Sequence, residues 1–183
     1  MSLILGILAQ AGGAPASLNS YESISTVTVG SGGSSTITFS SIPSTYKHLQ
    51  IRAIAAHSTD EGYFKVRFNS DSGANYSWHE LIGNGSTAIS AGGGGKTFAL
   101  VDHAFTNGSN FGVSVIDILD YANTSKNKTV RALSGNDNNS AGYVVLNSSA
   151  WYDTTAISAI EITFTSNPIS QYSSFALYGI KGE

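Results

Sequence analysis

Residues 26–39 read TVTVGSGGSSTITF, and this stretch decides the fold class. Apolar residues alternate with threonine on both sides of a glycine-serine centre, so the two kinds of side chain point to opposite faces of an extended chain. Two such runs separated by glycines are typical of a β-hairpin. We therefore expect a hairpin here, with both valines, Ile37 and Phe39 facing a core.

The same alternation recurs along most of the chain. Strands are predicted, each bounded by Gly, Asn, Ser or Pro, at residues 48–55, 63–68, 78–82, 97–105, 111–121, 128–134, 143–151, 157–165 and 173–180. The run VSVIDIL at 113–119 is apolar on both faces, which predicts a central strand covered on both sides. About ten strands without an interior helix favour an all-β, two-sheet β-sandwich, and within that class we predict a jelly roll.

Length and composition place all these strands in one domain. The chain has 183 residues, of which only 11% are charged, and it contains 20 Gly and no Cys. We assign residues 21–183 to the β-sandwich domain and residues 1–20 to an apolar anchor arm with a Gly/Ala/Pro connector. A net charge of -3 leaves no basic field for a phosphate backbone, so nucleic acid is excluded as a partner.

The N-terminal arm contains five large apolar residues, Leu3, Ile4, Leu5, Ile7 and Leu8. They are too few to span a bilayer, so no membrane span is expected. They are too many to leave in water, so we expect them to pack against a partner surface. We predict that residues 2–11 are an assembly anchor, packed against a second copy of this chain or against a neighbouring protein. The alternative is that the arm folds back and caps one end of its own sandwich.

Titratable residues form no catalytic pattern. His48, His57, His79 and His103 are widely spaced, and none belongs to a two-histidine metal motif. Residues 69–75 place oxygen ligands at alternate positions as calcium loops do, but the terminal bidentate Glu is absent, which favours an Asx-rich turn. The run AGGGGK at 91–96 lacks the spacing of a phosphate loop and predicts a mobile hairpin loop. The chain is therefore predicted not to be an enzyme and to need no cofactor or metal.

Aromatic and amide residues offer a second kind of chemistry. Sugar-binding sites place an aromatic face against the pyranose ring and use Asn and Asp side chains for the hydroxyl groups. The candidates for such a glycan site are Tyr76, Trp78, His79, Asn136, Asn138 and Trp151. Packing in the core is the alternative role for the tryptophans.

Three segments carry a resemblance to a known group of proteins: SYESISTVTVG at 20–30, FSSIPSTYKHLQIR at 39–52 and FALYGIK at 175–181. With them the chain resembles virion-associated structural proteins of tailed bacteriophages, of the tail-fibre-like, head-fibre and capsid-decoration types. These segments form strands and bring no catalytic residue with them.

The resemblance implies a location and a set of partners. It implies a surface-exposed decoration, cement or fibre-type subunit of a virion, assembled in the cytoplasm of a bacterial host and docked through its N-terminal arm. The partners would be other capsid or tail proteins and further copies of the chain, with a homotrimer as the expected oligomer. The alternative function is host attachment by a lectin-like module that binds surface glycans. A polysaccharide-degrading enzyme is a third class, but it needs a close pair of carboxylates that the sequence does not offer.

Overall fold

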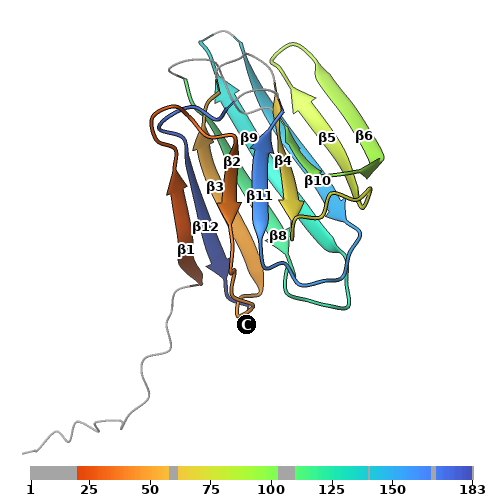
Figure 1. Cartoon of the computed structure of the whole chain (residues 1–183). Helices are drawn as coiled ribbons and strands as arrows, with labels where there is room; N and C mark the ends of the chain where they lie inside the picture. The colour runs from red at the N-terminus through yellow and green to blue at the C-terminus, as the bar shows by residue number, and fades with distance from the viewer. Residues whose placement is uncertain (1–19, 58–61, 103–109, 140, 166–167, 183) are drawn as a thin grey trace, which may run out of the picture.

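The computed structural model describes residues 20–57, 62–102, 110–139, 141–165 and 168–182, and these residues form an all-β protein (Figure 1). The strands are β1 (Tyr21–Thr28), β2 (Thr36–Phe39), β3 (His48–Ala55), β4 (Tyr63–Phe68), β5 (Tyr76–Gly83), β6 (Ala88–Lys96), β7 (Ala99–Asp102), β8 (Gly112–Leu119), β9 (Lys128–Asp137), β10 (Gly142–Trp151), β11 (Ile160–Phe164) and β12 (Ser174–Ile180). No helix occurs in the described ranges. The predicted anchor arm and His103 lie outside the described residues.

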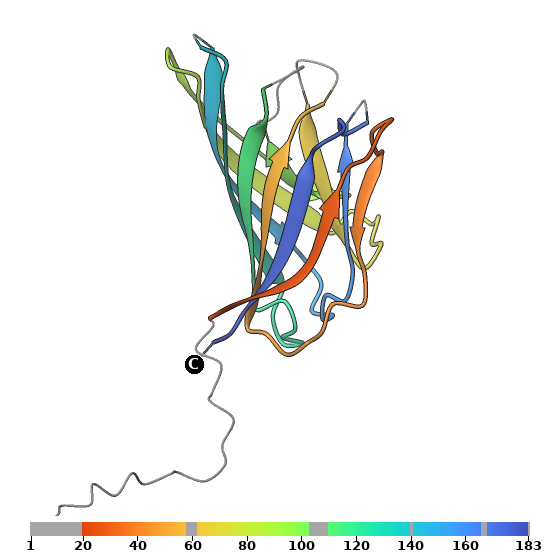
Figure 2. The ribbon, with the colours of Figure 1, turned by 90° about the vertical axis from the view of Figure 1, so that its left-hand side faces the viewer.

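The strands form two antiparallel sheets of unequal size. The larger sheet has eight strands in the order β1-β12-β3-β8-β9-β10-β5-β6, and the smaller has four in the order β2-β11-β4-β7. Figure 2 shows the two layers nearly edge-on. The predicted all-β sandwich is confirmed, while jelly-roll connectivity stays a prediction.

The core lies between the two sheets and is built from alternate residues of each strand. Ile51 and Ile116 project from the eight-stranded sheet, Ile37 and Val66 project from the four-stranded sheet, and all four are buried. Aromatic rings join the layers: the Phe68 ring of β4 lies 5.5 Å from the Trp151 ring of β10. Each such side chain contributes roughly 1.5 to 3 kcal/mol when it is removed from water, so burial of these alternate residues drives the sheets together.

Three sequence predictions for individual segments are wrong in whole or in part. Residues 26–39 do not form a hairpin, because β1 pairs with β12 and β2 pairs with β11, in different sheets. The glycine-rich connection carries the chain from one layer to the other, and Gly32 and Gly33 both adopt positive φ there. The inward orientation of Val29, Ile37 and Phe39 is nevertheless as predicted.

The second error concerns residues 91–96, which belong to strand β6 and not to a loop. Gly92 lies opposite His79 of β5, and a Cβ atom at Gly92 would lie 2.5 Å from the His79 imidazole carbon Cδ2. A side chain at this position would require the exposed His79 imidazole to move aside. The glycine run that favoured a loop is therefore compatible with a strand next to a large side chain.

Strand β8 is central, as predicted, but it is covered on one side only by the described residues. It lies between β3 and β9, with Ile116 and Ile118 buried in the core. On the other face Val113 and Val115 are exposed. The four-stranded sheet covers one face of the larger sheet, and no other described strand covers the second face.

Lys128 is a fully buried cation at the beginning of β9. Its Nζ donates hydrogen bonds to the carbonyl oxygens of Asn123 at 2.7 Å, Lys126 at 2.9 Å and Thr154 at 3.0 Å. Burial lowers the pKa of Lys128. Three carbonyl acceptors satisfy all three ammonium donors, so this side chain ties the β8–β9 loop to the segment that follows β10.

We predict that Lys128→Met destabilises the fold by about 3 kcal/mol or more, because it removes a buried ammonium group and three carbonyl groups lose their donor. Chemical denaturation of both proteins measures the difference. The matched control is Lys126→Met: Lys126 Nζ is exposed and bonds Asp120 Oδ2 at 2.8 Å, so its loss should cost less than about 1 kcal/mol. Equal losses for the two variants would contradict the structural role of Lys128.

Asp120 forms a second polar junction, between the segment before β3 and the β8–β9 loop. Its Oδ2 accepts a hydrogen bond from Lys126 Nζ at 2.8 Å and its Oδ1 forms an ion pair with Lys47 Nζ at 2.9 Å, while its backbone N–H donates to His48 Nδ1 at 2.9 Å. The hydrogen bonds from Lys126 and then Lys47 lower the pKa of Asp120 to about 2. The carboxylate is thus more stable in the folded chain than in the unfolded chain.

This pKa gives a prediction for acid stability. The unfolded pKa is near 3.9, so the contribution of Asp120 is fully present above about pH 4 and is lost as the pH falls toward about 2. We expect Asp120→Asn to remove about 1 kcal/mol at pH 7 and only a small part of that at pH 2, after allowing for solvent screening. Thermal unfolding of both proteins from pH 7 to pH 2 tests this, and a constant difference between their melting temperatures would refute it.

Candidate functional site

The tips of two hairpins lie side by side at one end of the sandwich. Strands β5 and β6 form one hairpin and β9 and β10 form the other, and β10 pairs with β5, so their turns are neighbours. Figures 1 and 2 place both turns at the end opposite the point where β1 begins. Glu22, near the beginning of β1, is in register with Val130 of β9 through β12, β3 and β8. From Val130, strand β9 runs seven further residues to Asp137, about 24 Å.

Side-chain oxygens of Asx residues hold both turns. In the β5–β6 turn, Asn84 Oδ1 accepts hydrogen bonds from the backbone N–H groups of Ser86 at 3.0 Å and Thr87 at 2.8 Å, and Gly85 has a φ of 85°. In the β9–β10 turn, Asp137 Oδ1 accepts from the N–H of Asn139 at 2.8 Å. Both turns are therefore stabilised by hydrogen bonds between residues two or three positions apart in the sequence.

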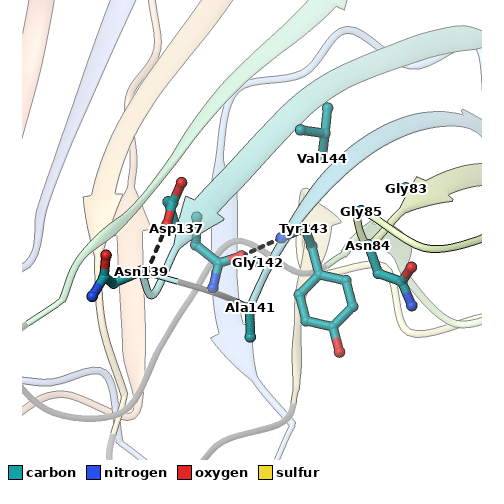
Figure 3. A pocket seen from close by; sticks show the side chains of 10 residues that line it. Gly83, Asn84, Gly85, Asp137, Asn139, Ala141, Gly142, Tyr143 and Val144 are labelled. Atoms are coloured by element: carbon teal, nitrogen blue, oxygen red, sulfur yellow. Dashed lines mark hydrogen bonds between the residues drawn. The ribbon is translucent and has the colours of Figure 1, made fainter.

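An open pocket of about 440 Å³ lies between the two tips. Figure 3 shows its lining, to which both hairpins contribute. The residues are Gly83, Asn84, Gly85, Asn136, Asp137, Asn139, Ala141, Gly142, Tyr143 and Val144. The residues that line this solvent-accessible hollow include three asparagines, one aspartate and one tyrosine.

The polar groups of this tip pocket are held in place by the backbone. Asn136 Oδ1 accepts a hydrogen bond from the Tyr143 N–H at 3.0 Å, across the β9–β10 pair (Figure 3). The Tyr143 ring is exposed and projects between Asn84 and Ala141 in the same view. Amides and carboxylates next to an aromatic ring are the groups that bind the hydroxyls and the apolar face of a sugar.

The six residues predicted for a glycan site do not come together. Tyr76 and Trp151 are 0% and 1% exposed and pack in the core, where the Trp151 Nε1–H donates to Asp71 Oδ2 at 2.7 Å. Trp78 and His79 are consecutive in β5 and point to opposite faces of the sheet. Asn136 lines the tip pocket, and Asn138 is next to it, with its Oδ1 accepting from Asn110 Nδ2 at 2.9 Å.

Sequence reasoning missed Asn84 and Tyr143, and from the loop at residues 136–139 it selected Asn136 and Asn138 but not Asp137 and Asn139. A local signal was present, because Asn84-Gly85 and Asn138-Asn139 are typical turn sequences. What the sequence did not reveal is the pairing of β10 with β5, which brings the two turns together. The pocket depends on that long-range pairing.

The remaining candidates for chemistry have structural partners. Asp71 Oδ1 accepts from the Gly73 N–H at 2.8 Å and its Oδ2 accepts from Asn75 Nδ2 at 3.0 Å, which is the geometry of an Asx-rich turn. Hydrogen bonds from Asn75 and Trp151 lower the pKa of Asp71. Among the described residues no three His, Asp or Glu side chains are grouped as a metal site. Of the described residues that line the pocket, Asp137 is the one carboxylate, whereas glycoside hydrolysis generally uses two.

Comparisons with protein-family models, curated proteins and solved structures give no match to this chain. The resemblance to bacteriophage structural proteins therefore stays a prediction. A search of the described ranges for membrane-spanning helices finds none of sufficient length and apolarity.

Proposed function

We propose that this chain is a surface-exposed structural subunit of a bacteriophage virion, of the decoration, cement or fibre type, held to its neighbours by the apolar residues near its N-terminus. The observation that carries the proposal is the separation of the two ends of the sandwich. The chain enters β1 at one end, where the Lys181 N–H donates to the Ser20 carbonyl oxygen at 3.0 Å. The tip pocket lies at the other end (Figure 2).

This arrangement suits a module that is anchored at one end and exposed at the other. The ladder of β1 with β12 fixes the end of the sandwich at which β1 begins. The five apolar residues of the arm would each contribute roughly 1.5 to 3 kcal/mol on full burial in a partner, before the cost of ordering the arm. That is sufficient for an anchor, and the sandwich then needs no further contact with the particle.

Deletion of residues 2–11 tests the anchor. We expect the truncated chain to unfold cooperatively at nearly the original temperature, because residues between Ile24 and Leu177 already supply a buried core between the two sheets. The same deletion should abolish incorporation into particles, measured by quantitative mass spectrometry of gradient-purified virions.

A matched pair of variants makes this test sharper. Serine at Leu3, Ile4, Leu5, Ile7 and Leu8 should abolish incorporation, whereas valine at the same five positions should preserve it, because valine keeps the apolar character. A truncated chain that unfolds would show that the arm belongs to the core. A truncated chain that still enters particles would show that the anchor lies elsewhere.

A second function, binding of host-surface glycans, is favoured by the tip pocket. Its amides, its carboxylate and the exposed Tyr143 ring lie at the end that the first proposal places outward. The two functions are compatible, because a virion subunit can also attach to a host.

For this second function we predict that Tyr143→Ala weakens binding on a glycan array about tenfold, since it removes the aromatic face of the pocket. Tyr152→Ala is the matched control. Tyr152 directly follows the other end of β10, is 57% exposed against 38% for Tyr143, and does not line the pocket. A wild-type chain that binds no glycan, or equal losses in both variants, would remove the pocket from consideration as a glycan site.

A further inference from the structure

The face of the eight-stranded sheet that points away from the core carries a continuous apolar surface. We define this outer apolar face by Ile54, Leu81, Val113, Val115, Leu133, Val144 and Leu146, whose exposed fractions range from 37% to 63%. They come from the five neighbouring strands β3, β8, β9, β10 and β5. In Figure 2 the four-stranded sheet lies on the opposite side of these strands.

The strand registers show that the surface is contiguous. Val115 of β8 is opposite Leu133 of β9, Leu133 is opposite Leu146 of β10, and Leu146 is opposite Leu81 of β5. Adjacent strands are about 4.8 Å apart, so these four side chains form an unbroken row across the sheet. A second row, one pleat away, contains Ile54 opposite Val113, with Val144 beyond Gly135.

The surroundings of the face resemble the rim of a protein interface. The outward positions of the five strands include no Lys or Glu, and their charged residues are Arg52, Asp117, Arg131 and, at the tip of β9, Asp137. Arg52 lies over the ring of Tyr21 at 5.7 Å and that of Tyr178 at 5.5 Å. Protein interfaces are rich in Arg and Tyr and poor in Lys and Glu, whereas an ordinary solvent-facing sheet is not.

Polar residues on this rim are also held in fixed positions. Arg52 Nε–H donates to Gln50 Oε1 at 3.0 Å, and Gln50 Nε2–H donates to Asp117 Oδ1 at 2.8 Å. Asp117 is in turn opposite Arg131 in the ladder of β8 with β9. The rim therefore presents both signs of charge side by side, which allows a second identical face to pair with it reciprocally.

We propose that the outer apolar face is covered by the same face of a second copy of this chain, in a two-fold symmetric pair. Seven half-exposed aliphatic side chains amount to about 600 Å² of apolar area, at the upper limit for the largest patch of a typical monomer. Two such faces bury about 1,200 Å², which reaches the size of a specific and stable interface. The pairing goes beyond the virion proposal, because it requires no other protein.

Sedimentation velocity of the full 183-residue chain tests the pairing. We expect a species of two copies, and we expect Leu133→Arg and Leu146→Arg to weaken self-association at least about 30-fold, as for a central interface residue. The matched control is Ile89→Arg on β6. Ile89 and Leu146 are both 50% exposed, but Ile89 is paired with the buried Ile82 and points to the opposite face of the sheet. The control should associate like the wild type.

Unfolding of the arginine variants would mimic dissociation, so a second measurement is needed. The chain has no cysteine, and Leu133→Cys therefore introduces a single thiol. Its reaction with a thiol reagent should slow as the protein concentration rises, while the thiol of Ile89→Cys should react at a constant rate. A monomer in which the thiol of Leu133→Cys reacts freely, or a dimer that survives Leu133→Arg, would overturn the proposal. A trimer would also overturn it. Protection of the thiol that disappears when residues 2–11 are deleted would do so too, because it would show that the arm covers the face.

Discussion

The packing of a four-stranded sheet on one face of an eight-stranded sheet is the interaction on which the rest of the structure depends. Residues from both layers share one core, joined by aromatic contacts such as Phe64 of β4 with Phe175 of β12 at 5.4 Å between ring centroids. The smaller sheet covers only one face of the larger sheet. The second face of the larger sheet must therefore either be polar or be buried against something else. The second face of this sheet is not polar, because strands β8, β9 and β10 carry aliphatic residues on both faces.

The unequal layers also account for the position of the tip pocket. The β5–β6 and β9–β10 hairpins extend beyond the neighbouring strands in Figure 2, so their turns are accessible from several sides. Their Asx side chains are partly used to hold the turns, as Asn84 and Asp137 show. Proteins commonly carry binding residues on exposed loops of a rigid sheet, because the strands hold these loops in fixed positions.

Much of the fold could be predicted from local patterns, because alternation depends only on which face a residue occupies. The inward faces of β3 and β4, including Leu49, Ile51 and Phe64, are as expected. Strand partners could not be predicted, since pairing is decided by contacts far apart in sequence. The expected hairpin at 26–39 is therefore a crossing between sheets, and the glycines at 91–96 belong to a strand whose neighbours are Trp78 and His79.

The candidate site was less predictable for a related reason, because aromatic residues serve a core and a sugar site equally well. Tyr76 and Trp151 fill the core beside Phe68, while the exposed ring of the tip pocket is Tyr143, which sequence analysis did not select.

The central claim is that the sandwich has an attached end and an outward end. A cryo-electron microscopy map of the intact assembly that contains this chain tests it most directly. Our account predicts density for the sandwich with Ser20 directed toward the particle and with the β5–β6 and β9–β10 tips directed into solvent. A map in which the tips are buried against the particle and the Ser20 end faces outward would contradict it.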